Sequence, residues 1–82
     1  MSKLTSSEVQ TLFGALHSAT YKSIDDGYYA TANQDINLLA DLVPMLDIEL
    51  RASYTDFVGD VMRCLDQARM ISESRKAIGK GA

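Results

Sequence analysis

The sequence predicts a small all-α domain, either a three-helix unit or a helical hairpin with a long C-terminal helix bent near Pro44. Apolar residues recur at spacings of three and four along most of the 82 residues, which is the period of an amphipathic helix. No segment shows the sustained alternation of apolar and polar residues that is typical of a half-buried strand. Apolar residues make up 46% of the chain and charged residues 23%, as in folded globular domains. We therefore expect one domain over residues 1–82, frayed at residues 1–4 and 79–82.

The first helix is expected near residues 6–26. Thr5 is placed to accept a hydrogen bond from the Glu8 amide while the Glu8 side chain reaches back, which is the pattern of a capping box. Gly27 can adopt the left-handed conformation that ends many helices. The apolar face of this helix is predicted to contain Val9, Leu12, Phe13, Leu16, Thr20 and Ile24.

The second helix is expected near residues 33–43, after a turn over residues 27–33. Two residues could cap its N-terminus: Thr31, which has Gln34 three positions later, or Asn33. The sequence does not distinguish these two alternatives.

Pro44 interrupts the apolar pattern that continues from this second helix. A proline inside a helix removes one backbone hydrogen bond and clashes with the preceding turn, at a cost of about 3 kcal/mol or more. Val43 would be a poor N-cap for a helix that begins at the proline, whereas Asp41 could cap it and leave Pro44 in the tolerant first turn. We expect a kink or tight corner between Asp41 and Pro44, followed by a third helix near residues 45–77.

The third helix is predicted to be strongly amphipathic, and three sets of apolar positions describe it. Its main stripe contains Leu46, Leu50, Tyr54, Phe57, Val58, Val61, Leu65, Ala68 and Ile71. A seam of every seventh residue, typical of coiled-coil-like packing, begins in the second helix and continues across the bend through Ile36, Val43, Leu50, Phe57, Cys64, Ile71 and Ile78. The back of the helix carries Met45, Ile48, Ala52, Gly59, Met62 and Met70, which form either a second packing surface or scattered surface positions.

Charge is unevenly distributed along a chain whose net charge is −3. The segment from residue 25 to residue 50 has no base and six acids: Asp25, Asp26, Asp35, Asp41, Asp47 and Glu49. This block forms either a solvated face or a docking surface for a basic protein. Nucleic acid is a poor candidate partner, because binding to phosphates needs clustered Lys and Arg and the chain has only one small basic cluster, at Arg75, Lys76 and Lys80.

The chain has one cysteine and one histidine, so an intramolecular disulfide and the usual Cys/His zinc sites are excluded. Cys64 is interpreted as a buried apolar side chain and His17 as a half-buried structural one. A calcium-binding EF-hand around Gly27 is disfavoured, because it would place Lys22 and Ile24 at the first two ligand positions. We predict no catalytic, cofactor or metal site.

These features favour a non-enzymatic protein–protein interaction module, such as a small acidic adaptor, inhibitor or chaperone-like subunit. A chain this short buries little apolar surface alone, which favours a homo-oligomer or a protein partner. Alternatives are a structural protomer of a helical filament or secretion assembly and, third, a small helical regulator. The absence of a membrane-spanning or signal-like apolar run predicts a cytoplasmic protein without membrane contact. Candidate partner-binding residues are Asp25, Asp26, Tyr28, Tyr29, Asp35, Met45, Ile48, Met62 and Met70.

Overall fold

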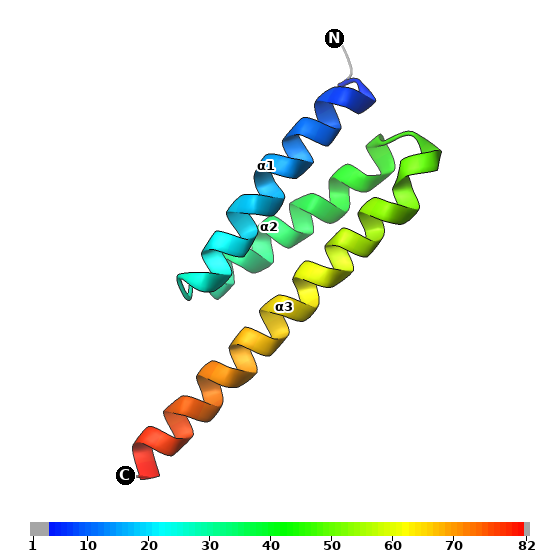
Figure 1. Ribbon diagram of the computed structural model, residues 1–82. Coiled ribbons are helices and arrows are strands. Elements are labelled where there is room, and N and C mark those ends of the chain that lie inside the picture. Colours follow the sequence, from blue (N-terminus) through cyan, green and yellow to red (C-terminus); the bar gives the residue numbers. More distant parts are fainter. Residues whose placement is uncertain (1–3, 82) are drawn as a thin grey trace.

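The protein is a three-helix unit in the computed structural model, which describes residues 4–81 and the side chains of residues 4–76. Helix α1 (Ser6–Asp25) and helix α2 (Tyr29–Leu42) form an antiparallel hairpin, and the first half of α3 (Ile48–Gly81) packs along both (Figure 1). A short 3₁₀ helix, η1 (Val43–Met45), joins α2 to α3. The predicted all-α fold is confirmed, as a three-helix unit in which α2 and α3 are separate helices.

The N-terminus of α1 is fixed by the predicted capping box. The Glu8 amide donates to Thr5 Oγ1 and the Thr5 amide donates to Glu8 Oε1, each over 3.1 Å. Donation by the Thr5 amide lowers the pKa of the Glu8 carboxyl, because the bond favours the charged form. The helix ends at Asp25, one residue before the expected end, and Gly27 adopts φ 84° as predicted.

Replacing Thr5 with alanine is expected to lower the free energy of unfolding by about 1 kcal/mol, because the Glu8 amide loses its acceptor. Thr11→Ala is the matched control, since Thr11 lies inside α1 and its hydroxyl donates only to the Ser7 carbonyl of the same helix. Alanine is the best helix former at such a position. Urea unfolding followed by circular dichroism measures both variants, and equal losses would contradict the assigned role of the cap.

The start of α2 was predicted wrongly. The helix begins at Tyr29, four residues before the expected start, so Thr31 and Asn33 lie inside it and neither of them is its cap. Tyr28 occupies the N-cap position without a side-chain hydrogen bond. Packing explains the early start, because Ala32 is fully buried and Tyr29 packs against the core. Tertiary burial therefore stabilises a helix end that has no local capping signal.

The corner at Pro44 exists, but it lies a few residues later than predicted. Pro44 sits in η1, Leu46 is extended (φ −82°, ψ 159°), and α3 begins at residue 48 instead of residue 45. Pro44 lies in the turn just after α2. Its missing N–H donor therefore interrupts no long helix. Arg51 closes the corner, since its guanidinium donates to the carbonyls of Leu46 and Pro44, each over 3.0 Å.

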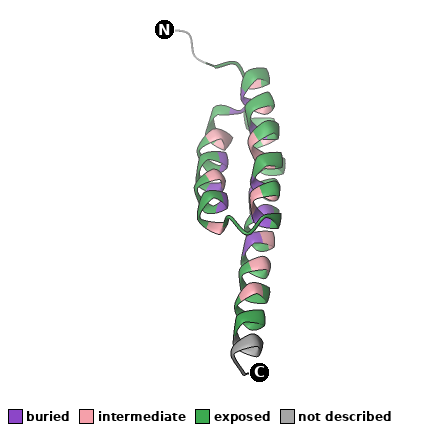
Figure 2. Ribbon diagram, turned by 90° about the vertical axis from the view of Figure 1, so that its left-hand side faces the viewer, coloured by how far each residue is buried: buried purple, intermediate pink, exposed green. Residues whose placement is uncertain are grey.

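The core joins all three helices, and buried positions line the surfaces that face each other (Figure 2). On α3 the core contains Val58, Val61 and Leu65 of the predicted main stripe. Phe57 and Ile71, which belong to both the main stripe and the seven-residue seam, lie at its edge and are 43% and 54% exposed. A straight helix of 3.6 residues per turn moves about 20° per heptad away from a strict seven-residue repeat. Ile78 lies outside the described side chains. The central cluster contains Phe13, Ile24, Ala32, Ile36, Leu39, Val58, Val61 and Leu65.

Candidate functional site

A largely apolar groove lies between α1 and α2, and we call it the hairpin groove. It has a volume of about 510 Å³, and its lining comes from α1, α2 and η1. Three large apolar side chains of this groove, Leu12, Leu38 and Met45, are about half exposed (47–52%). Exposed apolar groups that gather in one concave place are typical of a binding surface. The full lining is Leu12, Ala15, Leu16, Ala19, Leu38, Asp41, Leu42 and Met45.

The helical register creates the groove. On α1 the small residues Ala15 and Ala19 lie one turn apart between larger side chains, so the backbone is open to close approach there. On the facing side Leu38 and Leu42 of α2 and Met45 of η1 follow at spacings of four and three and form the other wall. The result is a furrow between two antiparallel helices, which has the shape that receives the ridge of another helix.

The polar groups around the hairpin groove are mostly acidic. Asp41 lines it, and Glu8 lines an adjoining hollow that shares Leu12. Asp35 lies three residues before Leu38 on α2, and Lys22 is the base three residues after Ala19 on α1. Asp41 and Glu8, which line the groove and the hollow beside it, form an acidic rim.

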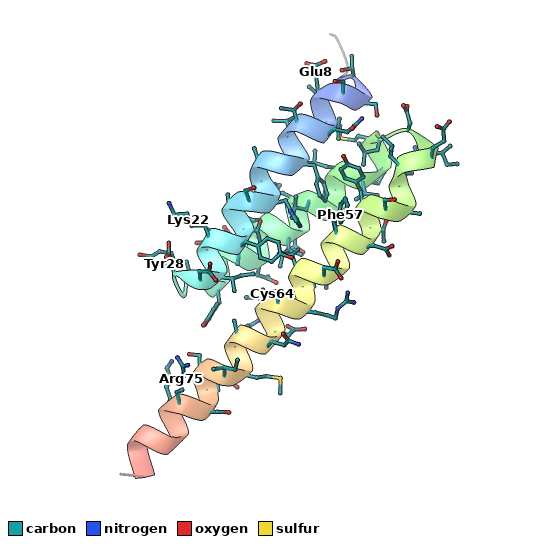
Figure 3. The ribbon with its side chains drawn as sticks, in the orientation of Figure 1. Glu8, Lys22, Tyr28, Phe57, Cys64 and Arg75 are labelled. Carbon is teal, nitrogen blue, oxygen red and sulfur yellow. The ribbon has the colours of Figure 1, made fainter. Side chains whose placement is uncertain are left out.

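An aromatic cluster joins α1 to α3 on another side of the molecule (Figure 3). Phe13 meets Tyr54 edge to face at a centroid distance of 4.8 Å, and His17 meets Tyr21 at 4.9 Å. The Nε2 atom of His17 is buried and has no hydrogen-bond partner among the described residues. Burial is the main cause that raises the pKa of Tyr21, with smaller contributions from Cys64 and Asp60. The half-buried His17 therefore lies among aromatic rings.

The predicted acidic and tyrosine candidates gather partly at the α1–α2 turn. Asp25, Asp26 and Tyr28 are exposed there, and Tyr28 points away from the bundle (Figure 3). Tyr29 behaves differently, because it is half-buried and its hydroxyl donates to the Ala68 carbonyl over 3.4 Å. Tyr29 therefore covers the end of the core, while Tyr28 faces solvent. Asp35 lies apart from this group, half-buried in the middle of α2.

The apolar candidates from the back of α3 are not one surface. Met45 lines the hairpin groove, whereas Ile48, Met62 and Met70 are exposed at separate levels of α3. A Cβ added at Gly59 would meet only Arg63 Nη1, at 3.8 Å, so no other described helix approaches that glycine. The nine predicted partner-binding residues thus lie in several places, and their roles stay predictions.

Sequence reasoning missed the hairpin groove as a site, although it named two of the residues on or beside it, Met45 and Asp35. Leu12 and Leu16 were assigned to the core face of the first helix, yet Leu12 is exposed and Leu16 only half-buried. A signal was present, because Ala15 and Ala19 extend the apolar surface of α1 well beyond its core face.

Comparison with protein-family models, with curated proteins and with solved structures found no match for this chain. Of the helices in the described part of the chain, none is both long and apolar enough to cross a bilayer. Within the same residues, no three His, Cys, Asp or Glu side chains gather in a way that could hold a metal ion.

Proposed function

We propose that this chain is a non-enzymatic protein–protein interaction module whose hairpin groove holds an amphipathic helix with basic flanking residues. The observation that carries this proposal is the half-exposed apolar lining of Leu12, Leu38 and Met45 in one furrow. Helix-in-groove recognition uses such a surface. The partner helix buries there an apolar face whose anchor residues are three and four positions apart.

The charge around the groove supports a basic occupant. Asp41 lines the groove and Glu8 lines the hollow beside it. Lysine or arginine at the edges of a docked helix would meet these carboxylates, which mainly favours fast association and the correct orientation. These charges support a partner with a basic surface, which we propose docks at the groove.

The non-enzymatic part of the proposal is supported by the positions of the cysteine and the histidine, which both take part in packing. Cys64 is half-buried and packs against the core cluster. His17 packs against Phe13 and Tyr21, and its Nε2 atom is buried. Both groups therefore contribute to packing between α1 and α3.

A synthetic amphipathic helix made of leucine, alanine and lysine is expected to bind the hairpin groove. Methyl signals of Leu12, Leu38 and Met45 should shift on titration in nuclear magnetic resonance spectra, because the peptide buries these side chains. Leu38→Glu should weaken binding at least about tenfold, since the groove must then take up a carboxylate beside Asp41.

Met62→Glu is the matched control for this titration. Met62 is 48% exposed, close to the 52% of Leu38, but it lies on α3 away from the groove. The control should bind the peptide as the unaltered chain does. Shifts that map to α3 instead, or equal effects of both substitutions, would contradict the proposal.

A further inference from the structure

Helix α3 continues well past the α1–α2 hairpin (Figures 1 and 2). The hydrogen bond from the Tyr29 hydroxyl to the Ala68 carbonyl marks the level of the hairpin end. We call residues 69–81 the C-terminal extension. Thirteen helical residues measure about 20 Å, at 1.5 Å per residue. This long projection accounts for much of the 57 Å length of a molecule only 23 Å and 15 Å across.

The described part of the C-terminal extension is both apolar and basic. Met70 and Ile71 are 67% and 54% exposed, and Ile71 also lines an open hollow with Ile24 and Tyr29 of the hairpin. From residue 69 to residue 76 there are three bases, Arg69, Arg75 and Lys76, and one acid, Glu73. The segment therefore has a net charge of +2 and the character of the amphipathic helix that the hairpin groove would hold.

We propose that the occupant of the hairpin groove is the C-terminal extension of a second copy of this chain. This inference rests on the proposed function, because it names the helix that the groove receives. Met70 and Ile71 of one copy meet Leu12 and Leu38 of the other, while Arg75 and Lys76 approach the acidic rim.

Length and connectivity support contact between copies. From Ser7 to Ala19 the α1 side of the groove and its adjoining hollow extends over about 18 Å, close to the length of the extension. The extension cannot reach the groove of its own copy, because α3 is one continuous helix from Ile48 to Gly81 that leads away from the hairpin. A second copy is therefore needed to bring the two surfaces together.

The contact joins two different surfaces, and each copy carries both of them. Such contacts produce either a closed ring, of which a reciprocal dimer is the smallest, or an open chain. A variant with a defective groove keeps its extension, and a variant with a defective extension keeps its groove. The two variants are therefore complementary.

Sedimentation of the full chain tests this inference. The unaltered chain should associate as its concentration rises, and either Leu38→Glu or the double variant Met70→Glu, Ile71→Glu should weaken association about 100-fold. An equimolar mixture of these two variants should give a 1:1 heterodimer, because one intact groove meets one intact extension. Met62→Glu should associate as the unaltered chain does.

Charge reversal gives a second set of variants that leaves the apolar surfaces intact. Asp35→Lys, Asp41→Lys in one chain, or Arg75→Glu, Lys76→Glu in another, should each weaken self-association at least about tenfold. Mixing the two reversed chains should restore association. Circular dichroism verifies that every variant keeps its helical content.

Several outcomes would overturn the inference. These are a monomeric unaltered chain at all concentrations, self-association that tolerates Leu38→Glu, and a mixture of the groove and extension variants that stays monomeric. Binding of the leucine–alanine–lysine peptide distinguishes failure of the inferred self-association from failure of the proposed function. Binding of the peptide to the groove of the Met70→Glu, Ile71→Glu chain preserves the proposed function, whereas loss of peptide binding there overturns both.

Discussion

Replacing Leu39 with alanine is expected to lower the free energy of unfolding by about 3 kcal/mol. Leu39 is completely buried in the cluster that joins α1, α2 and α3, and alanine would leave a cavity among packed side chains. A domain of this length is expected to have a total stability of about 4 to 12 kcal/mol, so the loss is a large fraction of it. Urea unfolding followed by circular dichroism gives the difference from the midpoint and slope of the transition.

The neighbouring leucine provides the control for this substitution. Leu38 is 52% exposed in the hairpin groove, and Leu38→Ala removes the same atoms from the same helix. Its effect on stability should stay within about 0.5 kcal/mol, as for other surface substitutions. Similar losses in the two variants would contradict the assignment of one leucine to the core and the other to the groove.

The parts of the fold that were predicted correctly are those with a local physical signal. Thr5 and Glu8 define the start of α1 through two hydrogen bonds that span three residues, so the sequence alone indicates them. Gly27 likewise marks the end of α1, because its positive φ suits a residue without Cβ. The apolar spacing of α3 predicted its buried side, where Val58, Val61 and Leu65 lie.

The errors occur where distant contacts determine the structure. Tyr29 begins α2 because it packs against the core and reaches the Ala68 carbonyl, 39 residues away. The corner after Pro44 is closed by Arg51, whose guanidinium meets carbonyls five and seven residues earlier. Neither contact leaves a capping motif in the sequence, so both boundaries were misplaced by a few residues.

The hairpin groove was missed because apolar residues on one helix can serve two surfaces. Val9 and Phe13 of α1 are buried, whereas Leu12, one position away from Phe13, lies in the groove. A hydrophobic pattern shows that a helix has apolar sides, but it does not show which neighbouring helix covers each of them. That assignment depends on the packing of α2, which covers only part of the apolar surface of α1.

Replacing Val61 with aspartate is expected to destabilise the chain more than Leu39→Ala does. Val61 is completely buried on the side of α3 that faces the core cluster. An unpaired carboxylate there would cost about 3 to 5 kcal/mol or more, in addition to the lost burial of the valine methyl groups. The variant should therefore lose about 4 kcal/mol or more of its free energy of unfolding, measured by urea unfolding followed by circular dichroism.

The next residue of α3 tests whether this effect comes from burial instead of from a negative charge in the helix. Met62→Asp adds the same carboxylate one position later, where the side chain is 48% exposed. Its unfolding transition should remain cooperative and lie within about 1 kcal/mol of the unaltered chain, since the charge stays in water. A Val61→Asp variant as stable as the unaltered chain, or an unfolded Met62→Asp variant, would show that α3 presents a different side to the hairpin. Such a result would also remove the basis for assigning the opposite surfaces of α1 and α2 to the groove.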